Sequence, residues 1–549
     1  MRGRTSALLL VACLLAAACG EDDADGGATT DEHVSDTDDV VAPPEASETT
    51  KDSPGAADSD PEELASVDGG TVEGAPEPLD VEVAPFLPTV CPFEIEVDLH
   101  VECGVVEVPE SRVDLSTSTI ELAVAILRTP APDPAPDPVV FLAGGPGGVA
   151  LAEHFVWLSG ADDWDEHPVF ATRDMILVDQ RGTGYSRPSL WCDDENEDPA
   201  GCHDRLVDAG IVLEAYSTLE NAADIATVRL SLGIDEWNLY GSSYGTRLAL
   251  TVLRDHPEGV RSLLLEGVYP PDVVPAYHDY LPNTLRALDE LAAACEADDR
   301  CASTYGDVGD LLVRALAAAD ADPGAPIDPT DLMDLTFGNL YSMEGVLDVP
   351  YALALAADGD LDGAIDVFEA GAPLGRTTVG PYGRNSHGRW AVDPTEDSAG
   401  LFNTVECREE HAFTDLDHVG RQAEMYIAAG VDERLITALV DAVEYPVLAV
   451  CSVWESGTAS VAERAPAVSD APVLLLSGRF DPITPPAWGD IAAASLPNST
   501  HVVAPTLSHS LLLEDPCVDE ITFAFLDDPS ARVDTRCIAT MPMPPFTTD

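Results

Sequence analysis

The sequence predicts an α/β fold with a mostly parallel central sheet and a mainly helical insert, and three observations support this. Short, continuous apolar runs recur along the chain and are typical of strands buried on both faces. Turns rich in Gly, Asp or Pro follow these runs, and stretches that can form helices separate them. A long block between the fourth and fifth continuous runs breaks this rhythm and carries apolar residues at helical spacing.

The strands are expected where the apolar runs lie. An alternating segment comes first, at residues 120–126, and its period of two is typical of a half-buried strand. The continuous runs follow at residues 139–142, 175–178, 237–240, 263–265 and 473–476, and Val502 and Val503 mark a sixth strand within 498–503. Helices are expected at residues 246–254, 285–294 and 311–319, and the last two lie in the insert.

Composition divides the chain into segments. Residues 20–84 are rich in Asp, Glu, Ala, Thr and Pro, and they have too few large apolar side chains to offset chain entropy. We expect them to form a disordered acidic tether after a signal segment at 1–19. The remaining segments are the two parts of the core, 85–274 and 466–549, and between them a helical lid at 275–465.

The N-terminus has the features of an export signal. Arg2 and Arg4 precede a short apolar stretch that ends in small residues and is too short to span a bilayer. The residues around Cys19 resemble a bacterial lipobox, in which the cysteine is lipidated after cleavage. Cys13 also fits the pattern but leaves too short an apolar region before it. We expect lipidation at Cys19, with plain secretion as the alternative, and a lipid anchor as the sole membrane contact.

The charge balance excludes one class of function. The chain carries 100 acidic and 26 basic residues, a formal net charge of −74. Such a surface repels phosphate backbones, so we expect no nucleic-acid partner. The charge is expected to serve solubility.

The cysteines indicate an oxidising compartment. Two of the twelve cysteines lie in the signal segment, and the other ten are an even number, as disulfide pairing requires. Near neighbours are expected to pair, which leaves one further pair. The expected disulfides are Cys91–Cys103, Cys192–Cys202, Cys295–Cys301, Cys407–Cys451 and Cys517–Cys537. Their spacing does not match a zinc site, so we expect neither a metal nor an organic cofactor.

A candidate nucleophile lies at Ser243. Residues 241–245 fit the pattern G-x-S-x-G, a predicted strand precedes them, and residues 246–254 can form a helix. This is the context of the nucleophile elbow of the α/β-hydrolase fold, where the serine projects above the sheet from a very tight turn. The sequence therefore predicts this fold, with Ser243 as the nucleophile.

The oxyanion hole is expected from two backbone N–H groups. One belongs to Tyr244, directly after the nucleophile, and the other to the glycine-rich loop after the strand at 139–142. We favour Gly145 as the second donor. A simple tight turn is the alternative for this loop, whereas a phosphate-binding loop is disfavoured because no Lys-Ser/Thr follows.

The acid and base are expected late in the chain, in the order Ser, Asp, His. Asp481 follows the strand at 473–476, and His509 lies in the loop after the strand at 498–503. His509 would take the proton of Ser243, and Asp481 would orient the imidazole.

Other polar residues are weighed against these. His501 is a rival base, but it falls inside a strand. A turn-forming role is the alternative for Asp481. Asp179 and Arg181 lie in another turn at a strand end, where a structural ion pair or turn anchor is expected.

Four separated motifs occur in a fixed order along the chain. They are Gly-Gly-Pro-Gly at 144–147, Asp-Gln-Arg-Gly-Thr-Gly at 179–184, Gly-Ser-Ser-Tyr-Gly-Thr at 241–246 and Gly-Arg-Phe-Asp-Pro-Ile-Thr-Pro at 478–485. With the cysteine pairs, they resemble the secreted tripeptidyl aminopeptidases of actinobacteria, which are relatives of proline iminopeptidase. The resemblance implies that short peptides are cleaved from a free N-terminus through an acyl-enzyme on Ser243.

The chain departs from this resemblance at two positions. Ala143 stands where proline iminopeptidases carry His before Gly-Gly-Pro-Gly, and Ser508 stands where family members often have Gly before the catalytic His. Neither change removes an atom of the predicted triad, but both bear on substrate choice.

An enzyme that acts at a peptide N-terminus must hold a protonated amine, and carboxylates do this through charge-assisted hydrogen bonds. Glu406, Glu409 and Glu410 flank Cys407 in the expected lid, so a disulfide could fix them near the site. A solvated acidic helix face is the alternative.

Three functions are therefore compared. The first is a monomeric serine aminopeptidase with a peptide substrate, exported to the cell envelope or secreted. The second is a carboxylesterase or lipase with the same triad, which motifs alone do not separate from a peptidase. The third is a surface lipoprotein that keeps the fold for binding without catalysis.

Overall fold

The computed structural model describes residues 84–93, 95, 99–114, 118–152, 169–193, 198–273, 275–321, 324–371 and 396–548. The expected signal segment, the lipidation site Cys19 and all but the last residue of the expected tether lie outside these residues. No helix in the described part of the chain is both long and apolar enough to cross a membrane.

A nine-stranded sheet organises the described residues, with strand order β1-β2-β3-β5-β4-β6-β7-β8-β9. β1, β2 and β3 pair antiparallel, β3 also pairs antiparallel with β5, and the other neighbours pair in parallel. The strands are β1 (Leu87–Thr89), β2 (His100–Pro109), β3 (Thr119–Arg128), β4 (Val139–Leu142), β5 (Met175–Val178), β6 (Trp237–Ser242), β7 (Val260–Glu266), β8 (Val473–Gly478) and β9 (Ser499–Ala504). The mostly parallel sheet confirms the predicted fold class.

The alternating segment in β3 differs from the prediction of a half-buried strand. Leu122 and Val124 are buried on one face, but Ala123 and Ala125 are buried on the other. β3 lies between β2 and β5, so both of its faces are covered, and the small alanines allow close packing there. The expected alternation reflects side-chain size rather than exposure to water.

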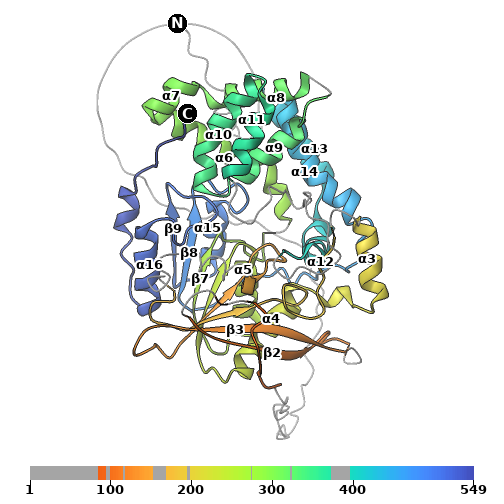
Figure 1. The fold of residues 1–549 in the computed structure, drawn as a ribbon, viewed down its shortest axis with the longest axis vertical. Coiled ribbons are helices and arrows are strands. Elements are labelled where there is room, and N and C mark those ends of the chain that lie inside the picture. The colour runs from red at the N-terminus through yellow and green to blue at the C-terminus, as the bar shows by residue number, and fades with distance from the viewer. Residues whose placement is uncertain are drawn as a thin grey trace, which may run out of the picture. The chain divides into compact units, whose positions relative to one another are not determined.

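Helices and no strand occupy the described residues between β7 and β8. Figure 1 shows several of them gathered beside the sheet, and contacts join α10 to both α8 and α11. They are α6 (Tyr280–Ala297), α7 (Asp299–Tyr305), α8 (Val308–Ala321), α9 (Pro329–Asn339), α10 (Met343–Ala357), α11 (Leu361–Gly371), α12 (Ala399–Glu409), α13 (Leu416–Ala428) and α14 (Glu433–Tyr445). A helical insert therefore separates β7 from β8 in the sequence, as expected, although the two strands pair directly in the sheet. Its role as a lid stays a prediction.

The remaining helices belong to the core, and all but the last of them lie between strands in the sequence. They are α3 (Pro199–Asp208), α4 (Thr218–Ser231), α5 (Tyr244–Asp255), α15 (Pro486–Ala494) and α16 (Pro516–Asp527). One apolar cluster joins a face of the sheet to α16 and to most of the insert, and a second joins the other face to α4, α5 and α15. The sheet is thus buried on both faces, which is why its central strands read as continuous apolar runs.

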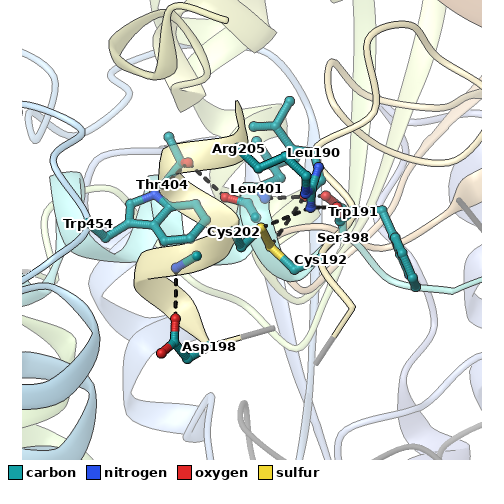
Figure 2. Close-up of a disulfide and its surroundings, with 12 residues drawn as sticks. Leu190, Trp191, Cys192, Asp198, Cys202, Arg205, Ser398, Leu401, Thr404 and Trp454 are labelled. Carbon is teal, nitrogen blue, oxygen red and sulfur yellow. Dashed lines mark hydrogen bonds between the residues drawn. A yellow bond between two sulfur atoms is a disulfide. The ribbon is translucent and has the colours of Figure 1, made fainter. Parts of the chain in front are cut away.

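Five disulfides have the pairing expected from the sequence: Cys91–Cys103, Cys192–Cys202, Cys295–Cys301, Cys407–Cys451 and Cys517–Cys537. Figure 2 shows Cys192–Cys202 beside residues of α12 and its N-cap. The Trp454 indole N–H donates to Thr404 Oγ1 (3.0 Å) on the same helix. The same Trp454 ring meets His203 of α3 edge to face, and Cys407–Cys451 joins α12 to the end of the insert. This number of disulfides indicates an exported protein.

Candidate active site

Ser243 lies at a sharp turn between β6 and α5. Its backbone has φ 55° and ψ −122°, a region that a non-glycine residue rarely occupies and that costs about 1–3 kcal/mol. A Cβ on Gly241 would lie 2.5 Å from the Gly245 carbonyl oxygen, and one on Gly245 would lie 1.9 Å from the Leu142 carbonyl oxygen. Side chains cannot fit at either position, so the G-x-S-x-G pattern here reflects a real nucleophile-elbow geometry.

Asp481 and His509 are hydrogen-bonded to each other. His509 Nδ1 lies 2.8 Å from Asp481 Oδ2, and Thr484 Oγ1 donates to the same oxygen (2.5 Å). The backbone N–H groups of Ile483 and Thr484 donate to Asp481 Oδ1 (2.9 and 2.8 Å). Burial alone would raise the pKa of Asp481, but the charge and hydrogen bond of His509 and the bonds from Thr484 bring it below its ordinary value. Asp481 is thus held as a carboxylate against the imidazole.

The segment Glu266–Gly267 at the end of β7 lies between the serine and the imidazole. The Ser243 backbone N–H donates to the Glu266 carbonyl oxygen (2.9 Å). On the next residue, a Cβ placed on Gly267 would lie 3.0 Å from His509 Cε1. Although Ser243, Asp481 and His509 are distant in sequence, they are therefore brought to the same edge of the sheet.

The glycine-rich loop after β4 faces the nucleophile. A Cβ on Gly144 would lie 3.6 Å from Ser243 Oγ, so no side chain separates the loop from the serine. The Gln180 side-chain amide holds the start of this loop by donating to the Ala143 carbonyl oxygen (2.9 Å). Tyr244 is the first residue of α5, where backbone N–H groups have no partner within the helix. Tyr244 and the loop with Gly145 thus flank Ser243, and their role as oxyanion donors stays a prediction.

The helical insert holds both loops of the acid and the base. The His509 N–H donates to the Tyr341 carbonyl oxygen (3.0 Å), and the Ser508 hydroxyl donates to the Leu340 carbonyl oxygen. The Tyr341 ring also meets the imidazole edge to face, with centroids 5.0 Å apart. Ser508, the departure from the resembled family, therefore has a structural role here.

From α6, Arg286 Nη1 donates to the Arg479 carbonyl oxygen (2.6 Å), and Arg286 Nη2 donates to the Asp481 carbonyl oxygen. The sequence did not predict a role in the site for Arg286, Gln180 or Thr484. Arg286 and Gln180 bind partners distant along the chain, and Thr484 binds Asp481 within the same turn. The Thr in the motif at 478–485 was the one available signal for Thr484.

The rival residues have structural partners. His501 lies in β9 with its ring nitrogens 3.0 Å from Ser477 Oγ and 2.9 Å from Asp490 Oδ1. Asp179 anchors a turn by accepting from the N–H groups of Leu151 and Tyr185 (2.9 and 2.7 Å). The structural interpretation of Asp179 is consistent with these contacts.

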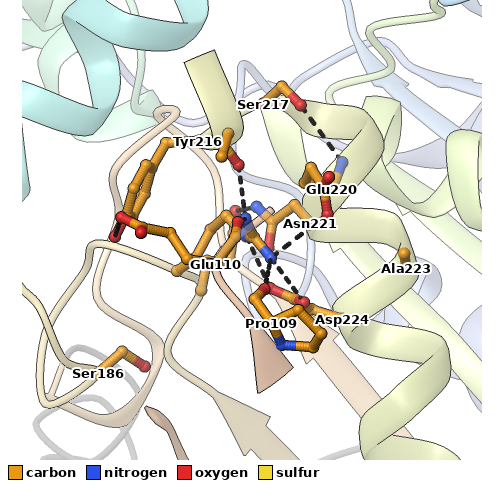
Figure 3. A network of polar contacts seen from close by, with 12 residues as sticks. Pro109, Glu110, Ser186, Tyr216, Ser217, Glu220, Asn221, Ala223 and Asp224 are labelled. Carbon is orange, nitrogen blue, oxygen red and sulfur yellow. Dashed lines mark hydrogen bonds and ion pairs between the residues drawn. The ribbon is translucent and has the colours of Figure 1, made fainter. Parts of the chain in front are cut away.

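Arg181 belongs to a buried ion network, in which its guanidinium donates to both oxygens of Asp224 at 2.8 Å. Figure 3 shows Asp224 and Glu220 on α4 facing this network. Arg112 completes it by donating to Glu220 Oε2 (2.7 Å) and Asp224 Oδ1 (2.8 Å). Arg181 thus pairs with Asp224 and not with its neighbour Asp179.

The three glutamates of α12 and its C-cap are buried, which contradicts the alternative of a solvated helix face. Glu409 accepts from the Thr218 N–H (2.8 Å) and hydroxyl (2.7 Å), and Glu410 accepts from Arg247 and from the Ala276 N–H (2.8 Å). Both carboxylates therefore have partners within the protein.

Glu406 differs from its two neighbours. It is 4% exposed, and its Oε2 has no hydrogen-bond partner. Burial, and then the neighbouring Glu410, raise the pKa of Glu406 to about 8. His411 is also 4% exposed with both ring nitrogens unpartnered, and burial lowers its pKa to about 4. The Tyr277 ring packs against His411 at an interplanar angle of 33°, with ring centroids 4.2 Å apart. Glu406 and His411, near the C-terminal end of α12, therefore both have buried polar atoms without a hydrogen-bond partner.

Metal ligation does not explain this cluster. In the described ranges, no group of three or more His, Cys, Asp or Glu side chains is arranged to hold a metal ion. Glu409 and Glu410 instead direct their oxygens to Thr218, Arg247 and the backbone.

The chain is similar to several known proteins. The serine protease Hip1 of Mycobacterium tuberculosis is 24% identical over 465 residues, which cover 77% of this chain and 84% of the relative. The proline iminopeptidase of Neisseria meningitidis serogroup A is 33% identical over 132 residues, 24% of this chain. The chain thus spans about a third of the length of that iminopeptidase (33%).

A crystal structure of proline iminopeptidase from Mycobacterium smegmatis aligns with a TM-score of 0.35 at 18% identity, over 78% of this chain and 98% of that one. A protein-family model described as the alpha/beta hydrolase fold matches residues 137–516. Since this match covers more than half of the sequence and agrees with the observed sheet, the chain belongs to the α/β hydrolase family.

Proposed function

We propose that this hydrolase is a serine aminopeptidase that releases short peptides or residues from free peptide N-termini. The observation that carries the proposal is the Asp481–His509 hydrogen bond at the same sheet edge as the strained Ser243 turn. The similarity to proteins named as a serine protease and as proline iminopeptidases supports a peptidase. Neither the geometry of the triad nor these similarities distinguish the release of tripeptides from the release of other short products.

In the proposed reaction, His509 takes the proton of the Ser243 hydroxyl while Ser243 Oγ bonds to the scissile carbonyl carbon. The carbonyl oxygen becomes an oxyanion, which the N–H groups of Tyr244 and Gly145 would bind. The C–N bond then breaks, and the imidazolium gives its proton to the leaving amine. Water repeats the sequence on the acyl-enzyme and returns Ser243 to its free form. Asp481 stabilises the imidazolium in both steps.

Glu406 is proposed to bind the substrate ammonium group. Its unpartnered Oε2 is a vacant acceptor in a buried setting, where a charge-assisted hydrogen bond is strong. An ammonium group beside it would favour the ionised carboxylate, so binding would release the proton that burial retains. Glu409 and Glu410, whose oxygens have internal partners, would position Glu406 through α12.

The place of α12 supports a short acyl product. Its N-cap Ser398 contacts the glycine-rich loop, because the Ser398 N–H donates to the Gly147 carbonyl oxygen (2.9 Å). Glu406 lies eight positions after Ser398, which is about 12 Å along a helix. About three or four extended residues span that length. A peptide attacked beside this loop could therefore place its amine near Glu406 after a few residues.

The proposal is tested by digesting matched peptide sets with free and acetylated N-termini. We expect cleavage near free N-termini alone, and a loss of more than about 1,000-fold in Ser243→Ala and His509→Ala. His501→Ala is the matched control and should retain activity. Hydrolysis of p-nitrophenyl esters without cleavage of any peptide would instead favour the carboxylesterase or lipase. Failure of a fluorophosphonate to label Ser243 would favour the non-catalytic surface protein.

We also propose that Cys19 carries a lipid anchor, since the residues before it resemble a lipobox. Metabolic labelling with a fatty acid should mark the wild type and not Cys19→Ser. Labelled Cys19→Ser protein, or unlabelled wild type, would contradict the anchor.

A further inference from the structure

Glu266 is a buried carboxylate that the proposed reaction does not use. It is the last residue of β7, and its position at the carboxyl end of a central strand places it next to the nucleophile turn. Its backbone and its side chain contact different parts of the site. It is thus a candidate for a role that the motifs do not reveal.

The backbone of Glu266 contacts the nucleophile side. Its carbonyl oxygen accepts from the Ser243 N–H (2.9 Å), which fixes the strained residue against β7. The following residue, Gly267, lies directly against the His509 ring, as the 3.0 Å approach of a Cβ to Cε1 shows. Displacement of this strand end would therefore move the serine relative to the imidazole.

The side chain of Glu266 contacts the loop after the base. Oε2 accepts from the N–H groups of Leu511 (3.2 Å) and Leu512 (3.1 Å), two and three residues after His509. Oε1 accepts from the Tyr240 hydroxyl (2.5 Å) on β6, the strand that leads into Ser243. One side chain thus joins the strand before the nucleophile to the loop after the base.

We infer that Glu266 is a positioning residue, which sets the distance between Ser243 and His509 by linking β6, β7 and the His509 loop. The inference rests on the proposed triad. Because Glu266 interacts electrostatically with His509, its carboxylate also favours the imidazolium that forms when the serine proton is taken. Burial raises the pKa of Glu266 above its ordinary value, and the hydrogen bonds from Tyr240 and from the backbone offset only part of this rise.

Two variants separate the hydrogen bonds from the charge. Glu266→Gln keeps an acceptor for the loop N–H groups but removes the charge, whereas Glu266→Ala removes both. Charged groups that face Glu266 from the following segment are Glu514 and Asp519. Glu514→Gln is the matched control, since it removes a nearby charge without touching the three hydrogen bonds of Glu266.

The experiment measures kcat, the pH profile of kcat/KM, and the rate of fluorophosphonate labelling at Ser243. We expect Glu266→Ala to lower kcat about 100-fold and Glu266→Gln about tenfold, a loss of about 2.7 and 1.4 kcal/mol. KM should change little, because Glu266 is not proposed to touch substrate. The acid limb of the profile should move to lower pH in Glu266→Gln, as the imidazolium loses a nearby negative charge, and stay in place in Glu514→Gln.

Wild-type kcat and an unmoved acid limb in Glu266→Gln would overturn the inference. Loss of activity that follows loss of thermal stability, and returns at lower temperature, would also overturn it, since Glu266 would then serve folding alone. Glu266→Gln keeps the test valid if Glu266→Ala does not fold. An active Ser243→Ala enzyme would instead refute the proposed function itself.

Discussion

Two buried charge clusters in this protein differ in their numbers of guanidinium groups and carboxylates. Around Arg181, two guanidinium groups face two carboxylates, and each oxygen of Asp224 and Glu220 has a hydrogen-bond partner. Around Arg247, one guanidinium contacts Glu409 and Glu410 while Glu406 keeps an unpartnered oxygen. Both clusters are desolvated, so the difference lies in pairing and not in burial.

The difference indicates which cluster serves stability and which serves binding. A fully paired network holds elements together, and α4 is fastened to the end of β2 in this way. An unpaired buried carboxylate costs free energy, and such groups concentrate at functional sites. The comparison therefore predicts different outcomes for substitutions in the two clusters.

The largest effect is expected on folding when the balanced cluster is broken. Arg181→Leu would remove two of the three 2.8 Å bonds that Asp224 accepts, leaving the one from Arg112, and should lower the free energy of unfolding by about 3–5 kcal/mol. Denaturant unfolding with the disulfides intact measures this loss. Arg112→Leu, at a more exposed guanidinium, should lose less, and equal losses would contradict the ranking.

In the unbalanced cluster, substitution should affect binding and not folding. Glu406→Gln removes the negative charge proposed to bind the ammonium group and keeps only a neutral amide oxygen, so KM for free peptides should rise about 10- to 100-fold, or about 1.5–3 kcal/mol. The free energy of unfolding should stay the same or increase, because a costly buried group is removed. Hydrolysis of a reporter that lacks an amine is the control and should be unchanged. A destabilised Glu406→Gln protein would show that Glu406 serves stability, as the cluster around Arg181 does.

The raised pKa of Glu406 predicts a dependence of stability on pH. Its folded pKa of about 8 lies above the ordinary value of 4.5, so the folded state binds the extra proton. Stability is therefore complete below about pH 4.5 and falls as the pH rises towards 8, by about 1.4 kcal/mol per pH unit for one proton. The difference between wild type and Glu406→Gln, measured by unfolding at pH 6 and 7, should show this slope. A parallel pair of curves would show that Glu406 is ionised in the folded state.

The smallest effect is expected at Asp481, a functional carboxylate that is fully paired. Thr484→Val removes the hydrogen bond to Asp481 Oδ2 and the 3.1 Å contact of the same hydroxyl with His509 Nδ1, but keeps the two backbone bonds to Asp481 Oδ1. We expect kcat to fall about three- to tenfold, consistent with about 1 kcal/mol for a hydrogen bond. Steady-state kinetics measures the change, and Thr506→Val, which replaces another buried threonine, is the control. A loss of about 1,000-fold, or roughly 4 kcal/mol, would show that Thr484 does more than hold Asp481.

The sequence predicted the parts of the fold that depend on local pattern. β4 and β5 begin and end where their apolar runs do, because strands buried on both faces are apolar throughout. β2 was not predicted, since its sequence mixes Glu, Gly and Cys with valines and resembles no simple period. Its identity as a strand depends on its pairing with β3.

The candidate site, like the fold, was predictable where its residues belong to a local motif. Ser243, Asp481 and His509 lie in turns whose residue types and order carry a signal. Glu266 and Gln180 do not, because each side chain acts on a backbone group far along the chain. The sequence also does not distinguish Glu406, which has an oxygen without a hydrogen-bond partner, from Glu409 and Glu410, which do have partners.

The bonds from Ser508 and His509 to the carbonyl oxygens of Leu340 and Tyr341 limit how this enzyme could be rebuilt. The insert holds the base in place, so an insert transplanted from a relative would have to supply matching acceptors at the end of α9. Excising residues 275–465 would remove those acceptors together with any control over substrate. In this chain the inserted helices and the sheet are therefore not exchangeable modules, and they are expected to have diverged together.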